Sequence, residues 1–509
     1  MNGENKGVII ELLHTKTTPL PNNLISDQTF MKLSNPLFSG SKEFKEWVDL
    51  FISIDHLLVE SGLETALKSI MIQEQEIERG QPFDTGEQIR FQRKVSESLR
   101  VNVARGLSKK SFKAFSIALA DSHVLQAFCG YHRPWVKKIP SKSKLHELSK
   151  LIPSDIVSKM IDLLSVYLSS EVGSEFDFSA VFGDSTCIEL DIHHPIDWVL
   201  LKDAVISIMK SVKTIRRHGL KHRIGPPEGF MKQVNKISMA ISMSKSVRRQ
   251  ESKKQRKNLF RELKSLLRIC EAHGNRYLKV LQRDRSKSDL SEKQAEQISG
   301  RLVTVLEQVD MIIHQAHERI IGERQIHNKD KILSLHESHA KVYKRGKAGA
   351  DVEFGLQLFI AENREGIIVN WDLHDKSPKH DSKFVKPCLE HLDKIGLKPD
   401  LFSGDRGFWS NRNSAYLNMK AVTNHIFPKG NPSLRNQTES EEFKVSANRR
   451  SQTEARIGIL KNNFLGGQLN TKGFKQQKSQ VGWAILTHNL WVVAKRLGVE
   501  EDPPLAIAA

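Results

Sequence analysis

The sequence predicts an α/β protein in which a helical N-terminal region precedes strands and helices that are interrupted by a long all-helical segment. Apolar residues recur at helical spacing in KEFKEWVDLFISIDHLLVE, and residues from about 197 to 335 are rich in Lys, Arg, Glu, Leu and Ile. After residue 340 the period becomes that of strands, as in DVEFGLQLFIAEN. These changes of period define the predicted parts of the chain.

Residues 1–120 are predicted to form the helical N-terminal region, and residues 121–170 a helix-turn-helix-like segment that binds DNA. In the second range a basic, proline-containing turn precedes PSKSKLHEL, where Ser141 or Ser143 is placed to cap a helix. Lys142 and Lys144 at the start of this helix are expected to lie near DNA phosphates. Basic helix starts are also common on ordinary protein surfaces, so both interpretations stay open.

One domain is predicted from two separate ranges, 175–196 and 341–497, with the all-helical insertion at 197–340 between them. The first range contains SAVFGDSTCIELDI, which is typical of a strand. Alternate residues of this strand share one face, namely Ala180, Phe182, Asp184, Thr186 and Ile188. The insertion is expected to be a long antiparallel helical hairpin.

The second range predicts a regular succession of elements. A β-hairpin turns at Gly366, and the helix in SKFVKPCLEHLDKIG ends at Gly396. A short strand ends at Asp405 and is followed by a helix in NRNSAYLNMK and a strand in VTNHIFPKG. The next helix carries Glu454.

The charge of the chain favours a polyanionic partner such as nucleic acid. Lys and Arg number 78 against 59 Asp and Glu, which gives a net charge of +19. No run of about 18 apolar residues is present and the N-terminus does not resemble a signal peptide, so we expect a cytoplasmic protein without a membrane partner. The four cysteines lie far apart and offer neither a disulfide framework nor a CxxC zinc site.

Three acidic residues are placed where metal-dependent phosphoryl transfer needs carboxylates. Asp184 interrupts an apolar strand, where an acid is costly unless a cation or another partner compensates it. Asp405 follows a strand, between Gly404 and Gly407, and Glu454 lies on a later helix. Two hard divalent cations held by oxygen ligands drive such chemistry without Cys or His. Taken singly, most acids are surface groups, so the argument depends on their combination.

The text around these acids resembles the DDE transposases of bacterial insertion sequences. The matching segments are FGDST at Asp184, SGDRGF at Asp405 and RRSQTEARIGILKN at Glu454, within a resemblance that covers about residues 120 to 495. Arg450, Glu454 and Lys461 stand at the intervals of the family's R-x3-E-x6-K helix. The sequence departs from the family at Ala447, which occupies the position of the family's Tyr, a residue that assists contacts with the transposon end.

The resemblance implies an RNase H-like catalytic domain with a mixed sheet. It implies that Asp184, Asp405 and Glu454 bind two Mg²⁺ ions, or Mn²⁺, and catalyse cleavage at transposon ends and strand transfer into target DNA. The partner would be double-stranded DNA, bound by a homodimer in the bacterial cytoplasm in association with the nucleoid.

Helix geometry adds an expectation for the two basic residues of this motif. At 100° per residue, Arg450 and Lys461 lie within about 40° of Glu454 around the helix, so all three share one face. Both side chains are therefore expected to contact DNA phosphates, although an i, i+4 ion pair between Arg450 and Glu454 is the simpler reading.

Two other functions are compatible with these residues. A structure-specific nuclease would use the same metal chemistry without strand transfer. A domesticated DNA-binding protein would lack activity, but such proteins have usually lost one acid and this sequence retains all three.

Overall fold

The computed structural model describes residues 41–132, 138–173, 175–193, 196–244, 249–347, 350–375, 378–429 and 438–498. The chain divides into two compact units. Unit 1 comprises Met1–Ile188, Gln357–His374 and Lys379–Ala509, and unit 2 comprises Glu189–Leu356 and Asp375–Pro378. The two units are described separately below.

Unit 1 begins with helices, as the apolar periodicity predicts. The first five described are α2 (Lys42–Glu60), α3 (Leu63–Arg79), α4 (Thr85–Leu107), α5 (Phe112–Asp121) and α6 (His123–Phe128). Ser41, Asp84 and Ser111 cap α2, α4 and α5 by accepting a hydrogen bond from a backbone N–H of the first turn. The prediction of a helical N-terminal region is confirmed for these residues.

A buried ion cluster joins three of these helices. Arg100 on α4 donates to Asp55 on α2 at 2.6 Å and to Glu64 on α3 at 2.8 Å. A further bond from Arg100 reaches the carbonyl of Phe128 at 3.1 Å. Because charges removed from water must be compensated by partners, this arrangement fixes the relative positions of α2, α3 and α4.

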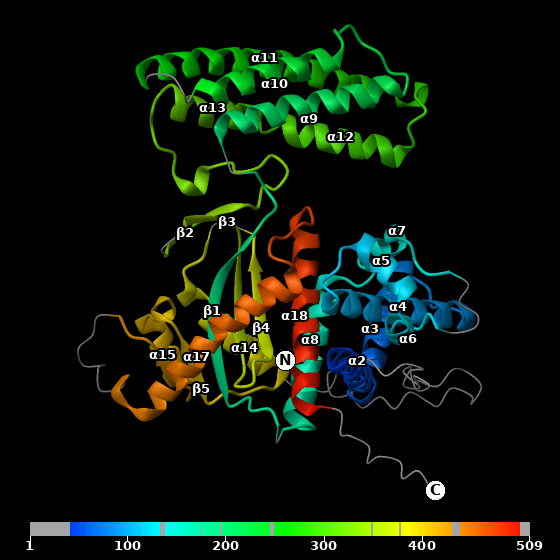
Figure 1. Ribbon diagram of the computed structural model, residues 1–509, viewed down its shortest axis with the longest axis vertical. Helices are drawn as coiled ribbons and strands as arrows, with labels where there is room; N and C mark the ends of the chain where they lie inside the picture. Colours follow the sequence, from blue (N-terminus) through cyan, green and yellow to red (C-terminus); the bar gives the residue numbers. More distant parts are fainter. Residues whose placement is uncertain are drawn as a thin grey trace. The chain divides into compact units, whose positions relative to one another are not determined.

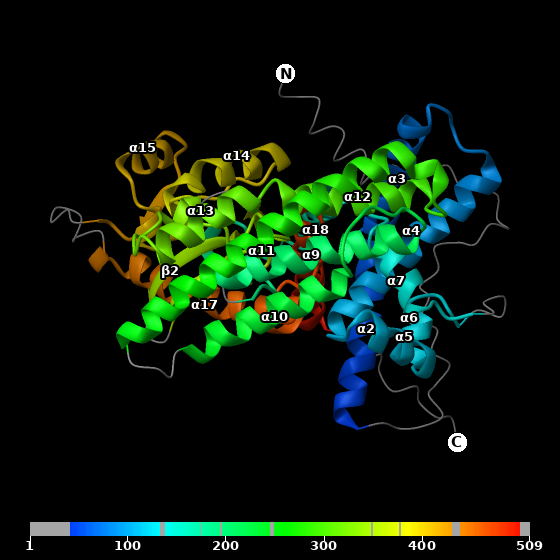
Figure 2. The same cartoon turned by 90° about the horizontal axis from the view of Figure 1, so that it is seen from above.

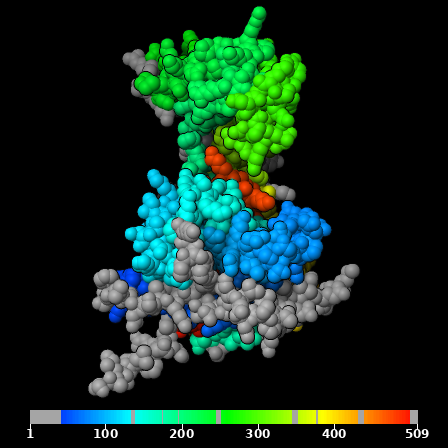
Figure 3. All heavy atoms as spheres, turned by 90° about the vertical axis from the view of Figure 1, so that its right-hand side faces the viewer, coloured from blue at the N-terminus to red at the C-terminus, as the bar shows by residue number. Residues whose placement is uncertain are grey.

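The predicted cap at the basic turn is present. Ser141 accepts from Lys144 N and begins α7 (Lys142–Leu148), which is followed by α8 (Ser154–Ser170). In Figure 3 the cyan atoms of the segment that includes α5 and α7 lie on the surface of unit 1. Helix α8 instead packs against α18 (Phe474–Leu497) and strand β4 (Ile368–His374), and Figure 1 shows α18 in red beside α8.

The sheet is mixed, as predicted. Its order is β2-β3-β1-β5-β6, with β4 also paired to β3. The parallel pairs are β1/β5 and β5/β6, and the antiparallel pairs are β2/β3 and β3/β4. The strands are β1 (Ala180–Glu189), β2 (Lys341–Lys347), β3 (Ala350–Glu362), β4 (Ile368–His374), β5 (Leu401–Gly404) and β6 (Thr423–Ile426). Strand β2 was not predicted because its sequence, KVYKRGK, has no apolar alternation.

The elements that follow the β3–β4 hairpin appear in the predicted order. Gly366 in the hairpin turn has φ +91°, and Gly396 ends α14 with φ +89°, both in the left-handed region that glycine adopts without a Cβ clash. The helices are α14 (Val385–Ile395), α15 (Asn411–Met419) and α17 (Glu441–Ile459), with a π-helical turn, η7 (Leu460–Leu465), directly after α17. Helix α17 packs on β5 and β6.

The described part of unit 2 contains a bundle of five helices, so the predicted helical hairpin is wrong. They are α9 (Asp197–Arg217), α10 (Pro227–Met243), α11 (Arg249–Asp284), α12 (Glu292–Leu306) and α13 (Val309–Ile320). Each of the other four contacts α9, and Figure 2 shows α9 and α11 running side by side. The helix breaks coincide with Gly219 at φ +93°, Pro at the start of α10 and a capping box at Ser291.

We expect Arg100→Met to lower the free energy of unfolding of unit 1 by about 3–5 kcal/mol, because it leaves two buried carboxylates uncompensated. Urea unfolding followed by circular dichroism measures the change. The matched control is Lys159→Met, which removes an exposed ion pair with Glu74 and is expected to cost less than about 1 kcal/mol. Equal losses in the two variants would contradict the role given to the buried cluster.

Candidate active site

The pairing of β1 with β5 brings two of the predicted acids to neighbouring positions, Asp184 in the middle of β1 and Asp405 directly after β5. Gly183 on β1 is the register partner of Gly404 on β5, and the strands are parallel. Asp184 directly follows Gly183, and Asp405 directly follows Gly404. Because paired strands lie about 4.8 Å apart, the two acids stand on adjacent strands at equivalent positions.

The environment of Asp184 raises its pKa to about 6 from an ordinary 3.8. Burial is the largest cause, since it disfavours the charged form, and the negative charges of Asp405 and Glu454 act in the same direction. The Ser185 N–H, 2.7 Å from Asp184 Oδ1, and the Arg450 guanidinium lower the pKa and offset part of this shift. Asp405, Glu454 and Arg450 are thus all close enough to act on Asp184.

Asp405 is held by the turn that follows β5. Its Oδ1 accepts a hydrogen bond of 2.7 Å from Gly407 N, which caps the short 3₁₀ turn η5 (Arg406–Phe408). A Cβ on Gly407 would lie 2.8 Å from Asp405 Oδ1 and 2.6 Å from Asp381 Oδ2. The glycine in SGDRGF is therefore required by the close approach of two carboxylates.

Asp381 is a site residue that the sequence analysis missed. It begins the 3₁₀ turn η4 (Asp381–Lys383), and its Oδ1 accepts a hydrogen bond of 2.6 Å from Ser185 Oγ. Burial and the charge of Asp405 raise its pKa, against the lowering effect of the Ser185 bond. The residue lies in a turn, where neither strand nor helix periodicity distinguishes a buried acid from a solvated one.

Helix α17 carries the third predicted acid. Glu454 Oε1 lies 3.8 Å from Arg450 Nη1, so the two residues form the expected i, i+4 pair. The Glu454 side chain is 60% exposed and the Arg450 side chain only 17% exposed. In this structure the carboxylate therefore faces solvent beside a largely buried guanidinium.

Lys461 is directed toward strand β1. It is the second residue of the π-helical turn, and its Nζ donates to the carbonyl of Cys187 at 2.7 Å. This carbonyl lies three residues beyond Asp184 on the same strand. The predicted contact of Lys461 with DNA phosphate is untested and stays a prediction.

Lys142 and Lys144 lie on α7, among the N-terminal helices of unit 1. Lys142 is exposed, whereas Lys144 is half-buried and its Nζ forms an ion pair of 3.0 Å with Glu147. Their predicted contact with DNA is also untested.

Oxygen atoms are the donors at this site, and hard cations such as Mg²⁺ prefer them. Burial of Asp184 beside a like charge is costly without a cation, which fits a metal-binding role. In the ranges that the structure describes, however, no three His, Cys, Asp or Glu side chains converge closely enough to hold one ion together. The partner of Glu454 in this arrangement is Arg450.

Comparison with known families identifies a domain in the second half of the chain. Residues 329–490 match the family model described as "Transposase DDE domain". The chain carries a transposase DDE domain. This confirms the resemblance drawn from the motifs and, with the mixed sheet, the RNase H-like α/β fold. Comparison with curated proteins and with solved structures finds no match.

The matched range includes Asp405 and Glu454, whereas Asp184 precedes it by sequence and joins it through the β1/β5 pair. The family assigns the chain a general function in transposition and DNA recombination. It also implies DNA binding, nucleic-acid cleavage and the use of divalent metal ions. Among the described helices, none is long and apolar enough to cross a membrane.

We expect Asp184→Asn to stabilise the metal-free protein more at pH 7.5 than at pH 4.5. A folded pKa of about 6 lies above the ordinary 3.8, so the folded state binds the extra proton between these values. Protonated Asp184 therefore contributes to the free energy of unfolding at low pH. This contribution, up to about 3 kcal/mol, is lost as pH rises through 6. Urea unfolding in EDTA at the two pH values measures the gain.

Asp177→Asn is the control of opposite sign. Burial alone would raise the pKa of Asp177, but hydrogen bonds from Ser179 and the Arg364 guanidinium lower it. Its contribution to stability is therefore present at pH 7.5 and is lost as pH falls, so this variant should lose stability at pH 7.5. A gain for Asp184→Asn that is the same at both pH values would contradict the assignment.

Proposed function

We propose that this protein is a DNA transposase that cleaves transposon ends and transfers the resulting strands into target DNA. Asp184, Asp405 and Glu454 are proposed to hold two Mg²⁺ or Mn²⁺ ions. The observation that carries the proposal is the parallel register of β1 and β5, which sets Asp184 beside an acid of the matched transposase domain. Two divalent cations, when bound, activate the attacking oxygen and stabilise the leaving oxygen.

The protein's own residues prepare this chemistry by holding the acidic side chains in fixed orientations. The Ser185 and Gly407 N–H groups orient the carboxylates of Asp184 and Asp405. Glu454, on a separate helix, supplies a third carboxylate that interacts electrostatically with Asp184. These acids come from the middle of β1, the end of β5 and helix α17. They can approach one another closely only when positive charge compensates their repulsion.

We propose that DNA is contacted by four basic residues: Arg450, Lys461, Lys142 and Lys144. Arg450 and Lys461 belong to the helix and π-turn of the site, whereas Lys142 and Lys144 start α7 in the segment 121–170. Since two transposon ends must be processed together, we further propose a homodimer on DNA. The predicted domain boundaries, with an insertion at 197–340, are part of the same proposal.

The first test replaces each acid by its amide. Asp184→Asn, Asp405→Asn and Glu454→Gln are each expected to reduce end cleavage by at least about 100-fold, because they remove metal charge, and to leave DNA binding within about threefold. Asp393→Asn is the control, since this exposed acid on α14 pairs with Lys420. Full activity in one amide variant would remove that acid from the site.

The products of the same assay separate a transposase from a nuclease. Pre-cleaved ends incubated with Mg²⁺ and a supercoiled target plasmid should become covalently joined to the plasmid. Efficient cleavage of ends without any joined product would replace the proposed function by that of a metal-dependent nuclease.

Salt provides a second test, of the DNA partner itself. With a net charge of +19, the protein is expected to neutralise several phosphates, so log Kd should rise steeply and linearly with log salt. Contacts to six phosphates would weaken binding by about 10³-fold between 50 and 200 mM salt. Fluorescence anisotropy with a labelled duplex measures the slope, and a flat line would exclude a phosphate-driven interface.

A further inference from the structure

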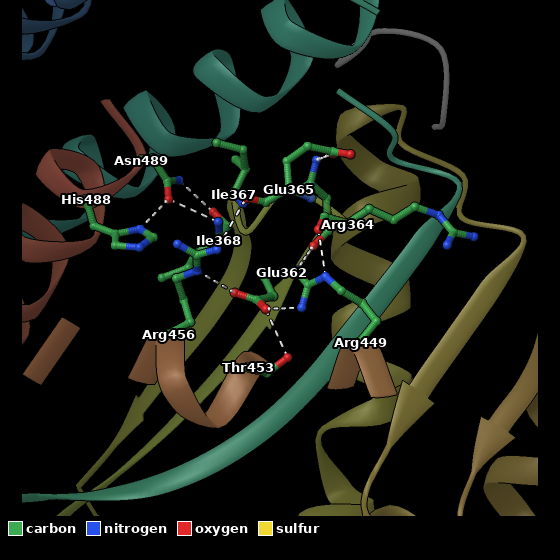
Figure 4. Close-up of polar contacts among 11 residues, drawn as sticks. Glu362, Arg364, Glu365, Ile367, Ile368, Arg449, Thr453, Arg456, His488 and Asn489 are labelled. Carbon is green, nitrogen blue, oxygen red and sulfur yellow. Dashed lines mark hydrogen bonds and ion pairs between the residues drawn. The ribbon is translucent and has the colours of Figure 1, made fainter. Parts of the chain in front are cut away.

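A buried acid at the end of β3 contacts the helix that carries Glu454. Glu362 is fully buried and accepts hydrogen bonds at Oε1 from Arg449 Nη1 at 2.8 Å and from Thr453 Oγ1 at 2.9 Å. Both donors come from α17, as Figure 4 shows. Strand β3 therefore contacts α17 at residues that are close to Glu454 in sequence.

Arginine side chains extend this contact to the hairpin turn. Arg449 also donates to the carbonyls of Arg364 at 2.6 Å and Asn363 at 2.7 Å. Arg456 Nε lies 3.6 Å from Glu362 Oε2, and the arginine covers Gly366 so closely that a Cβ there would be 2.2 Å from its Nη2. Three positions of α17 are thus fixed to one turn.

The hairpin itself is fixed from its other side by α18. Asn489 Nδ2 donates to Ile368 O at 2.8 Å and its Oδ1 accepts from Ile368 N at 3.0 Å (Figure 4). The pairing of β3 with β4 changes register between Ala361 and Glu362, and such irregularities redirect side chains. Glu362 therefore projects from a rigid support.

Helix geometry relates this contact to the site. At 100° per residue, Arg449, Thr453 and Arg456 lie at about −140°, −100° and −160° from Glu454 around α17. They form one strip, and Glu454 lies on a different side of the helix. A carboxylate about 6 Å from the helix axis moves about 1 Å when the helix turns by 10°.

We propose that Glu362 is a positioning residue that sets the rotation of α17 and thereby the place of Glu454 relative to Asp184. This inference rests on the proposed function of the site. Glu362 does not touch the reacting atoms, because it is fully buried against α17. Its effect passes through Arg449 and Thr453 to the adjacent Glu454.

Two substitutions in the full-length protein test the proposal. Glu362→Gln keeps an oxygen for Arg449 and Thr453 but turns an amide donor toward Arg456. Thr453→Val removes the hydroxyl bond to Glu362 at similar volume, and Thr453→Ser retains it. The matched control is Asp55→Asn, which weakens the separate buried ion cluster around Arg100 in the N-terminal helices.

We expect Glu362→Gln and Thr453→Val to lower the single-turnover rate of end cleavage by about 10- to 100-fold, as expected for a misplaced catalytic group. The Kd for end DNA should stay within about threefold, and Mn²⁺ binding without DNA, measured by calorimetry, should weaken. Thr453→Ser should restore the rate, and Asp55→Asn should change neither rate nor Mn²⁺ affinity by more than about threefold.

The outcomes distinguish this inference from the function on which it rests. If wild-type protein cleaves and Asp184→Asn does not, but Glu362→Gln and Thr453→Val behave like Asp55→Asn, Glu362 is only a structural residue and the inference is overturned. If Asp184→Asn cleaves and binds Mn²⁺ like wild type, the proposed function fails and the inference fails with it. Should Glu362→Gln not fold, the comparison of Thr453→Val with Thr453→Ser decides.

Discussion

The parallel pairing of β1 with β5 is the interaction on which the site depends, because it places two half-buried carboxylates, Asp184 and Asp405, side by side. Each acid follows a glycine. A Cβ on Gly183 would lie 3.0 Å from the Phe402 ring, and one on Gly404 would lie 3.1 Å from the Phe408 ring. Aromatic side chains thus pack directly against the two glycines that precede the acids. The Gly-Asp dipeptides of FGDST and SGDRGF reflect this packing as well as the chemistry of the acids.

Much of this arrangement is predictable from the sequence because it depends on local signals. The apolar strand around Asp184, the glycines beside Asp405 and the hairpin glycine Gly366 each report a local backbone or burial requirement. Glu362 shows where such reasoning ends. It is also an acid in an apolar strand, yet its compensation comes from Arg449, 87 residues away in sequence. Sequence alone indicates that a buried acid needs a partner but does not identify the partner.

Elements without a periodic pattern were missed for related reasons. Four of the seven residues of strand β2 are Lys or Arg, and Asp381 lies in a short turn, so neither has a neighbouring pattern that indicates burial. For the five described helices of unit 2 the sequence predicts a hairpin, because apolar residues recur at helical spacing through most of the segment. The breaks between these helices depend on single residues such as Gly219 and Pro227. Such single residues hardly change the composition of a long segment, so composition does not reveal the breaks.

Helix α17 and its π-helical extension bring these points together. Upstream, Arg449 and Thr453 bind Glu362, and downstream Lys461 binds the Cys187 carbonyl of the strand that carries Asp184. Glu454 lies between these two attachments. Because the helix is held on both sides of Glu454, the backbone of this residue has little freedom. Only the side-chain rotamer of Glu454 therefore separates the exposed, Arg450-paired position from one beside Asp184. The α17 backbone thus fixes the position of Glu454, and a rotamer change of its side chain provides the movement. This combination is expected of the proposed site, in which carboxylates close around positive charge.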